Sequence, residues 1–399
     1  MKIFSAFEEL GLADEILKGA FAYGFSQPSK IQQDAIKIIA SGANIILQSR
    51  NGTGKTAAFI IGMLQKIINQ SKNTYQSNCG SHNIGALCGK GVGEAKPGQT
   101  HSIEAIILSP TRDLALQTFG VFQGLAQFTS IKGYCAVGQE GSIAEDIKEV
   151  RKCNILFGTA GRVLHLIREL KQAFSTVHGI VVDEADRIVE SGFSLPVQGI
   201  CERLKAAKPQ FVFVSATLPD EVQPFFQEYA PDAKAILVPQ QELALERISQ
   251  YYIPAGKDRF NRMCDVFGAV SISQAVVFAN KKETVEEVGR NLQRHEFPAV
   301  VVHGALPQAE RNKRLSDFFS GKSRILVSTD VCARGIDAVH VNLVVNYDAP
   351  HTAEEYLHRI GRGGRFGKTS TAITFVNPGE STRAQGLYSA FGRTLKEWK

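Results

Sequence analysis

The sequence predicts an α/β protein of two tandem domains, each a parallel sheet flanked by helices. Its 399 residues suffice for two domains of ordinary size, each with its own core. Short β-branched, apolar runs alternate with longer helical patterns, which is typical of parallel strands joined by crossover helices. The runs fall into two sets, and residues 236–249 between them show no strand pattern, so we place the interdomain linker there.

The elements follow in order from this pattern. The first domain, residues 1–238, is expected to have strands at 44–48, 104–109, 153–158, 179–183 and 211–216. The second domain, residues 239–399, is expected to have strands at 274–279, 299–304, 324–329, 343–348 and 371–376. The single tryptophan, Trp398, is expected to pack a terminal helix, with a role as an anchor for a partner as the alternative.

One stretch, residues 71–102, departs from the alternation. It is polar and rich in Gly, Ser and Asn, which predicts a long surface loop or insert. Cys79, His82 and Cys88 lie in it, but no C-x2-C pair or fourth ligand at usable spacing accompanies them. The sequence therefore favours a plain loop over a zinc site.

Composition excludes several classes of protein. With 44% hydrophobic and 21% charged residues, the chain has no apolar run near the ~20 residues of a membrane span. The opening MKIFSAFEEL resembles neither a secretory signal nor a transit peptide, so we expect an intracellular location, cytoplasmic or nuclear. The seven cysteines are scattered, which favours reduced thiols. The net charge of +6 mildly favours an anionic partner.

The first chemical motif is NGTGKT, residues 51–56, between a predicted strand and a predicted helix. Such a loop turns backbone N–H groups and a helix N-terminus toward phosphates. Lys55 is expected to reach the β- and γ-phosphates of ATP, and the Thr56 hydroxyl to bind Mg²⁺. Ser49 stands where the G-x-x-x-x-G-K-[ST] pattern begins with glycine, but the backbone from Asn51 onward builds the cradle, so we expect an intact site.

The second motif is Asp183-Glu184-Ala185-Asp186, at the end of the predicted strand GIVVD. Open α/β sheets bind their ligands at the carboxyl ends of the strands, which is where these carboxylates fall. Asp183 is expected to hold the Mg²⁺ shell, and Glu184 to orient and deprotonate the attacking water. Together the two motifs predict an ATP-hydrolysing site.

At this point VVDEADRI and the residues around it resemble the DEAD-box ATP-dependent RNA helicases, from Phe7 to about Gly367. YGFSQPSKIQQ resembles the Q motif of that family, SPTRDLALQ motif Ia, GTAGR motif Ib and VSATLP motif III. VVFANKK resembles motif IV, STDVCARGID motif V and HRIGRGGRFG motif VI. The resemblance implies two RecA-like domains.

The resemblance also implies roles at the nucleotide. Gln32 would recognise adenine, since an amide pairs with its N6/N7 edge, and Phe25 or Phe7 would pack on the base. Asp337 would contact the ribose, while Arg362 and Arg365 would reach the γ-phosphate. The remaining phosphate-binding residues would be Gly52, Thr53 and Gly54. Coupling between nucleotide and RNA would involve Asp186, Ser215, Ala216, Thr217 and His358.

The RNA contacts implied by the resemblance lie in both domains. They are Pro110, Thr111, Arg112, Thr159, Gly161 and Arg162 in the first, and Gln308, Arg311 and Thr329 in the second. Such contacts touch phosphate and 2′-OH, so they select RNA without selecting sequence. Gln139 and Ala160 replace a glycine and a proline usual in the family. Weaker RNA binding and a neutral change both remain open.

The function implied is that of an ATP-gated clamp on RNA, acting as a monomer, which bends the strand and separates short duplexes or remodels RNA–protein complexes. One alternative is an RNA-binding scaffold locked by ATP, which fits a resemblance of residues 335–350 to the helicase of the SMN complex. A DNA translocase is disfavoured by the Q motif and motif III. The RNA target and the protein partners are not predicted.

Overall fold

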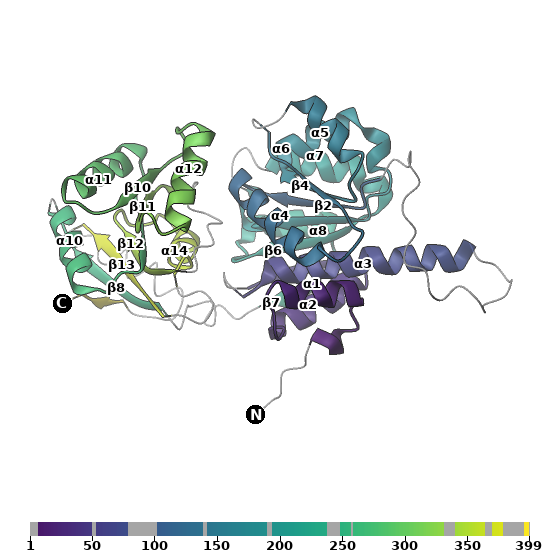
Figure 1. Ribbon diagram of the computed structural model, residues 1–399, viewed down its shortest axis with the longest axis horizontal. Helices are drawn as coiled ribbons and strands as arrows, with labels where there is room; N and C mark the ends of the chain where they lie inside the picture. Colours follow the sequence, from purple (N-terminus) through teal and green to yellow (C-terminus); the bar gives the residue numbers. More distant parts are fainter. Residues whose placement is uncertain are drawn as a thin grey trace. The chain divides into compact units, whose positions relative to one another are not determined.

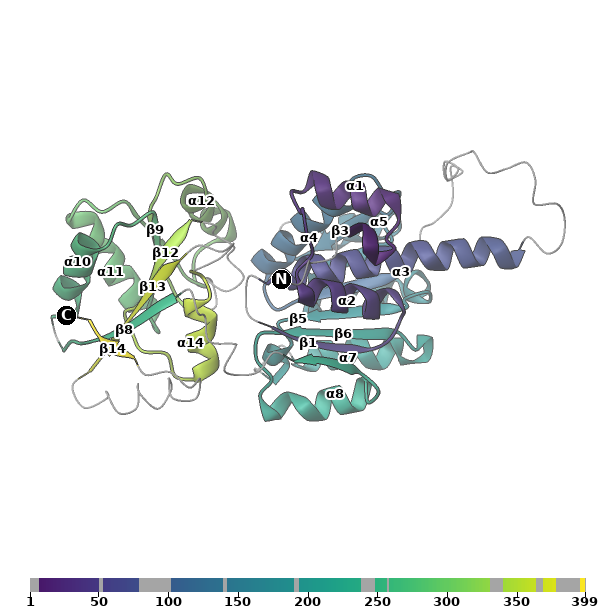
Figure 2. The same cartoon turned by 90° about the horizontal axis from the view of Figure 1, so that it is seen from below.

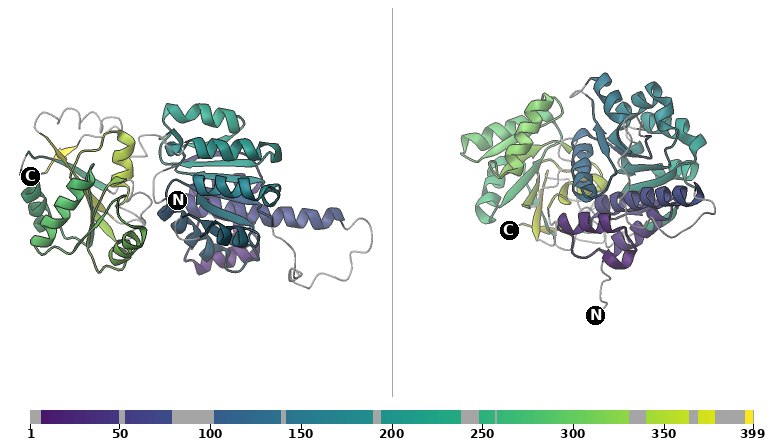
Figure 3. Two further views of the ribbon diagram at one scale, coloured as in Figure 1. Left: turned by 90° about the horizontal axis from the view of Figure 1, so that it is seen from above. Right: turned by 45° about the vertical axis from the view of Figure 1, so that its right-hand side comes forward.

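The computed structural model describes the chain as two compact units that divide between Leu237 and Val238 (Figure 1). The described residues are 7–49, 53–78, 102–138, 142–189, 194–237, 248–256, 258–330, 340–363, 369–377 and 395–398. In each unit helices cover both faces of a parallel sheet, as Figures 2 and 3 show. The predicted fold class is confirmed.

The sheet of the first unit has seven strands in the described residues, in the order β3-β4-β2-β5-β6-β1-β7. All neighbouring strands run parallel. Their bounds are β1 Ile45–Gln48, β2 Ala105–Ser109, β3 Gly133–Ala136, β4 Ile155–Thr159, β5 Gly179–Asp183, β6 Gln210–Ser215 and β7 Lys234–Leu237. Because every strand runs the same way, all their carboxyl ends lie along one edge.

Helices cover both faces of this sheet because its central strands are apolar on both sides. Along β2, Ala105 and Ile107 face one core cluster, while Ile106 and Leu108 face the other. The first face carries α1 Asp14–Ala22, α2 Lys30–Ala40, α3 Lys55–Asn78 and α4 Arg112–Ala126, and the other carries α5 Ile143–Val150, α6 Ala160–Glu169, α7 Ser194–Leu204 and α8 Gln223–Tyr229. The 3-10 turns are η1 Phe7–Leu10, η2 Lys171–Phe174, η3 Ala185–Val189, η4 Lys205–Ala207 and η5 Asp220–Val222.

Three helices of the first unit begin at a residue whose side-chain oxygen accepts a backbone N–H. Ser29 caps α2 and Ser142 caps α5, each in a reciprocal capping box. Thr111 caps α4 by accepting from the Leu114 N–H. Such caps satisfy N–H groups that have no partner within the helix, so these residues fix where each helix starts.

The second unit repeats the arrangement, with strand order β10-β11-β9-β12-β13-β8-β14 in its described residues, all parallel. The strands are β8 Ile248–Pro254, β9 Gln274–Phe278, β10 Ala299–Val302, β11 Ile325–Ser328, β12 Val341–Asn346, β13 Ser370–Val376 and β14 Lys396–Glu397. One face packs against α10 Arg259–Ala269 and α11 Lys282–Arg294, and the other against α12 Gln308–Phe319 and α14 Ala353–Ile360.

Three sequence predictions need correction. The linker expected at 236–249 overlaps the end of β7 and the start of β8. The loop expected at 71–102 begins later, because α3 continues to Asn78. Trp398 follows the short strand β14 and not a helix, and it packs edge-on against Tyr251 at a centroid distance of 4.9 Å.

Within the part of the chain described, no helix is long and apolar enough to cross a membrane.

Candidate functional site

The first candidate site lies at the carboxyl edge of the first sheet. Its residues follow β5, β6 and β1, three strands that lie side by side. Asp183 ends β5, Ser215 ends β6, and Ser49 directly follows β1. The fold therefore brings together the glycine-rich loop, the acidic motif and the Ser-Ala-Thr motif, which are far apart in the sequence.

Gly54 sits at the turn from the loop into α3. Its φ of +86° is a conformation that glycine adopts without strain. A Cβ added there would lie 2.3 Å from Nε2 of Gln32, so any side chain would displace the Gln32 amide. Thr53 and the helix residues Lys55 and Thr56 are half-buried. Asn51 and Gly52 lie outside the described residues.

Ser49 is fully buried and links the loop to the sheet. Its backbone N–H donates to the Ser215 carbonyl at 3.1 Å, and its hydroxyl shares a short hydrogen bond with the Thr53 hydroxyl. The Lys55 ammonium donates to the Ser49 carbonyl. Serine at this position therefore adds a hydrogen bond inside the loop that glycine could not make.

The Gln32 side chain is buried against this loop. Its Nε2 donates to the Gly54 carbonyl at 3.3 Å, and its Oε1 accepts from the Ser29 N–H at 2.8 Å. The Ser29 hydroxyl in turn donates to the Thr53 carbonyl at 3.2 Å. The start of α2 is thus attached to the loop at two points.

Two aromatic candidates differ in exposure. Phe7 is fully buried in the core, whereas Phe25 is half-buried, with ring centroids 6.2 Å apart. Tyr23 packs on Phe25 with centroids 5.3 Å apart. Stacking on a planar ligand needs an accessible ring face, so Phe25 is the better placed of the two.

At the turn after β5, the acidic motif places the buried Asp183 carboxylate beside the half-buried Glu184. Burial and, next, the neighbouring Glu184 carboxylate raise the pKa of Asp183 to about 7, while the Lys55 ammonium acts in the opposite direction. Glu184 has a φ of +49°, a left-handed conformation that is strained for a residue with a side chain. Its Oε2 is buried and accepts no hydrogen bond from the described residues. Such a pair favours a nearby cation.

The last acid of the motif joins the Ser-Ala-Thr segment. The Thr217 hydroxyl donates to Asp186 Oδ2 at 2.7 Å, and the Ser215 hydroxyl accepts from the Asp186 N–H at 3.3 Å. The Ser215 hydroxyl also donates to the Thr217 carbonyl at 2.6 Å. With Ala216 between them, these buried residues form one connected cluster behind the acidic motif.

The other polar candidates of the first unit follow β2 and β4, the strands on the far side of β5. Pro110, Thr111 and Arg112 come after β2, whose last residue Ser109 pairs with Thr159 at the end of β4. Gly161 is exposed, and the Arg162 guanidinium donates to Asp146, which also accepts from the Tyr134 hydroxyl at 2.6 Å.

The two departures from the expected pattern lie beside these residues. Ala160 is buried as the first residue of α6, a position that also suits proline, so alanine preserves the helix start. Gln139 lies outside the described residues.

In the second unit, candidate residues follow β10 and β11, which pair with each other. Gln308 begins α12, and its Oε1 accepts from Arg311 at 3.1 Å. Arg311 also donates to the Gly304 carbonyl at 3.0 Å. Thr329 directly follows β11 and is half-buried. These three residues thus lie at the carboxyl edge of the second sheet.

Motif VI begins within α14. His358 and Arg362 are both buried, and Arg362 Nε donates to the His358 carbonyl at 3.0 Å. Asp337 and Arg365 lie outside the described residues.

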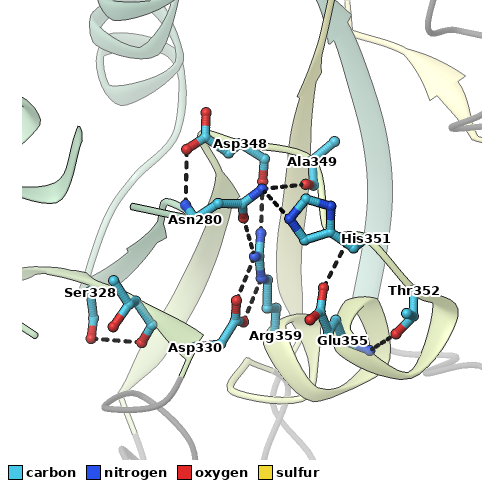
Figure 4. A network of polar contacts seen from close by, with 10 residues as sticks. Asn280, Ser328, Asp330, Asp348, Ala349, His351, Thr352, Glu355 and Arg359 are labelled. Atoms are coloured by element: carbon cyan, nitrogen blue, oxygen red, sulfur yellow. Dashed lines mark hydrogen bonds and ion pairs between the residues drawn. The ribbon is translucent and has the colours of Figure 1, made fainter. Parts of the chain in front are cut away.

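Sequence reasoning missed a polar network around Arg359 (Figure 4). This side chain is 1% exposed, and its Nε and Nη2 donate to the two carboxylate oxygens of Asp330, each at 2.6 Å. It also donates to Asn280 Oδ1 at 2.6 Å and to the Asp348 carbonyl at 2.7 Å. The guanidinium thereby connects the ends of β9, β11 and β12. Asn280, Asp330 and Asp348 lie in or beside predicted strands, but their sequence spacing does not indicate a contact with Arg359 on α14.

Replacing Arg359 by lysine is expected to destabilise the protein by about 2 kcal/mol. A lysine keeps the charge but cannot make four bonds in the planar geometry of a guanidinium. The measurement is denaturant unfolding of the purified protein, with Arg290→Lys as the control, since Arg290 lies in an exposed pair with Glu286. Equal stability of the two variants would contradict a structural role for the network.

Comparisons with known proteins match the whole chain. A family model described as DEAD/DEAH box helicase matches residues 29–225, and one described as Helicase conserved C-terminal domain matches residues 258–367. The ATP-dependent RNA helicase FAL1 of Vanderwaltozyma polyspora is 38% identical over 393 residues, which cover 97% of this chain and 91% of that protein.

Two solved structures are similar over both units. S. cerevisiae Dbp5 bound to RNA and ADP BeF3 has a TM-score of 0.83 and 31% identity, covering 98% of this chain and 95% of that one. Mss116p bound to ssRNA and AMP-PNP has a TM-score of 0.84 and 26% identity, covering 100% and 80%.

Proposed function

Since the chain belongs to the DEAD-box family of ATP-dependent RNA helicases, we propose that it clamps and bends RNA when ATP draws its two domains together. As a member of this family it is an ATP hydrolase of the RNA helicase type. The proposal assigns residues 1–238 to the ATP-binding domain and 239–399 to the helicase C-terminal domain. Clamping would separate short duplexes or remodel RNA–protein complexes.

The observation that carries this proposal is that the candidate ATP-binding residues and the candidate RNA-binding residues of the first unit follow different strands along one edge of the same sheet. The loop and the buried acids follow β1, β5 and β6, while the candidate RNA contacts follow β2 and β4. Because β2 and β5 are neighbours, the two groups meet along a single rigid edge. A change at one group can therefore reach the other through paired strands.

We assign the phosphates of ATP to the loop and the first turn of α3. Backbone N–H groups at the start of a helix favour an anion, and Lys55 would neutralise phosphate charge. Glu184 orients the attacking water and takes its proton. The residues of the cradle are Asn51, Gly52, Thr53, Gly54, Lys55 and Thr56.

The residues present fit a magnesium-bound nucleotide. The buried Asp183 carboxylate supplies the oxygen donor that Mg²⁺ prefers, and Thr56 supplies a hydroxyl at the helix start. The raised pKa of Asp183, and Glu184 Oε2, which has no hydrogen-bond partner among the described residues, support a cation at this place. Bound there, Mg²⁺ would neutralise charge that develops on the phosphates.

Adenine recognition is assigned to Gln32 and Phe25, with Phe7 supporting Phe25 from the core. The Gln32 amide already holds the Gly54 carbonyl, so base recognition and loop position would depend on one side chain. Because Gln32 would contact both the base and the loop, binding of the correct base would also fix the position of the loop.

Gln32→Ala is expected to raise the KM for ATP by about tenfold and to reduce the preference for ATP over GTP, because alanine makes neither hydrogen bond. The turnover number should also fall, since the tie to Gly54 is lost. Steady-state kinetics with both nucleotides measures this. The control is Gln33→Ala, since Gln33 donates to the Pro28 carbonyl and not to the loop. An unchanged nucleotide preference would contradict the assignment.

We assign RNA binding to the polar residues at the carboxyl edges of both sheets. Dbp5 and Mss116p, which have the same fold, are described as bound to RNA. These residues would contact the phosphates and 2′-hydroxyl groups of the RNA backbone. They are Pro110, Thr111, Arg112, Thr159, Gly161 and Arg162 in the first domain and Gln308, Arg311 and Thr329 in the second.

Closure would complete the hydrolytic site from the second domain. Arg362 and Arg365 are proposed to stabilise charge on the γ-phosphate, and Asp337 to contact the ribose. The cluster of Asp186, Ser215, Ala216 and Thr217, with His358, is proposed to couple closure to RNA. The hydrogen bonds within that cluster support the proposal, because they connect the acidic motif to the end of β6.

The proposal is tested by strand separation. The protein is expected to unwind a short RNA duplex with ATP and to hydrolyse ATP faster with single-stranded RNA than with DNA of the same sequence. Stable RNA binding with ATP but no unwinding would favour an RNA-binding scaffold instead. Equal stimulation by DNA would contradict RNA selectivity.

A further inference from the structure

A cavity of about 840 Å³ lies at the opposite edge of the first sheet, between the ends of α6 and α7. We call it the amino-edge cavity. These helices pack side by side (Figure 1). Its apolar lining includes Ile167, Phe174 and Leu204, which belong to the core, and its volume is in the range of ligand sites.

Three cations surround this apolar floor. Arg168 lies in the last turn of α6, Lys171 begins η2 and Arg203 lies in the last turn of α7, and all three are exposed. None forms an ion pair with a described carboxylate, and no described lining residue is acidic. Arg203 donates only to the Gly199 carbonyl at 3.3 Å. The cavity thus combines an apolar interior with an uncompensated basic rim.

The acids next to these cations already have other partners. Glu169 lies 3.9 Å from His165, and Glu202 accepts from the Tyr229 hydroxyl at 2.9 Å. Glu202 also lies 3.8 Å from Lys205, and within the described residues neither acid forms an ion pair with a rim cation, so the three cations can meet carboxylates of a molecule outside the chain.

The cavity is separate from the ATP and RNA sites. Phe174 shortly precedes the start of β5, and Ala207 shortly precedes the start of β6, so the cavity lies at the amino ends of these strands. Asp183 and Ser215 lie at the other ends, and a strand of this length spans about 16 Å. A molecule in the cavity would leave the carboxyl edge open.

We propose that the amino-edge cavity docks an acidic segment of a protein partner, which inserts one apolar side chain between Ile167, Phe174 and Leu204. Carboxylates on both sides of that anchor would meet Arg168, Lys171 and Arg203. An apolar anchor within a charged rim is the usual anatomy of a protein interface. A nucleic acid or a free polyphosphate would match the charges but would leave the apolar floor unfilled.

The test uses fluorescein-labelled heptapeptides with a central Phe, Leu, Trp or Ala and three Asp residues on each side. Binding to the full chain is measured by fluorescence anisotropy. The variants are Arg203→Glu, which reverses a rim charge, and Ala207→Trp, which fills the cavity. The control is Lys18→Glu, which makes the same charge change on α1, an exposed position on the opposite face of the sheet.

We expect the peptides with an apolar centre to bind at least about tenfold more tightly than the Ala peptide. Arg203→Glu and Ala207→Trp should each weaken peptide binding by about tenfold or more. Lys18→Glu should bind the peptides as tightly as the unmodified protein does. The RNA-stimulated ATPase rate of all three variants should be close to that of the unmodified protein. The ATPase also verifies that the variants are folded.

Three results would overturn the proposal. The first is that no peptide binds at millimolar concentration. The second is that Arg203→Glu and Lys18→Glu bind the peptides equally well. The third is that Arg203→Glu weakens the binding of oligouridylate or inorganic polyphosphate as much as it weakens the binding of the peptide, which would identify a general polyanion site.

Discussion

Replacing Lys55 by alanine is expected to reduce RNA-stimulated ATP hydrolysis by about 10²–10³-fold. The ammonium of Lys55 at the start of α3 is the cation assigned to the phosphates, and its loss leaves the transferred charge without a fixed counter-charge in the loop. The substitution also removes the hydrogen bond from Lys55 to the Ser49 carbonyl, so the loop loses one of its attachments. Nucleotide affinity should therefore fall as well.

Phosphate release in the presence of saturating single-stranded RNA measures the effect. Lys72→Ala is the matched control, because Lys72 is an exposed lysine on the same helix. The control should retain normal turnover. A Lys55→Ala protein that keeps most of its turnover would refute the assignment of the loop.

Arg365→Ala is expected to leave ATP binding nearly unchanged and to lower RNA-stimulated turnover by about 10³-fold or more. An arginine that acts on charge developing in the transition state contributes to the rate and little to ground-state affinity. All other groups proposed for hydrolysis, apart from Arg362, precede residue 238, so this substitution isolates the contribution of the second domain. ATP-dependent retention of RNA should weaken as well.

Two titrations on one preparation measure this. Titration with a fluorescent ATP analogue gives the nucleotide affinity, and titration with single-stranded RNA gives the rate of ATP hydrolysis. Arg290→Ala, an exposed arginine of α11, controls for loss of charge in the same domain. Normal RNA stimulation in Arg365→Ala would mean that the two domains do not build a composite site, and the clamp mechanism would fail.

The central strands could be predicted from the sequence because they are buried on both faces. The residues of β5, GIVVD, are all buried, and a short β-branched apolar run of this kind is typical of a central parallel strand. Four strands at or next to a sheet edge were missed, namely β3, β7, β8 and β14, whereas the edge strand β10 was predicted. Most of their side chains are half-buried or exposed, so the apolar pattern is diluted.

The end of α3 was missed for the opposite reason. Its last turns are polar, and composition alone favoured a loop from residue 71. A helix that has already formed can extend by one backbone hydrogen bond per residue, so its end depends little on apolar content.

Short segments such as the loop around Lys55 and the acidic motif could be recognised from the sequence as parts of a candidate site. Contacts between segments that meet only in space could not be predicted. Arg359 lies within a motif that the sequence made visible, yet nothing in the spacing of its arginines says which one is buried against Asp330 and Asn280. The attachment of Gln32 to Gly54 is likewise a result of folding.

The position of β1 in its sheet has a consequence for biosynthesis. Ile45 pairs with Val212 on one side and Lys234 on the other, so the strand that leads into the loop has no partner in the described sheet until β6 and β7 have left the ribosome. At about 5–20 residues per second, that delay is on the order of 10 s. Strand β2 pairs with β4 and β5, so these three strands can assemble sooner. The nascent chain would therefore complete the loop late, although the loop is encoded early, and a ribosome that stalls before residue 210 would leave β1 unpaired.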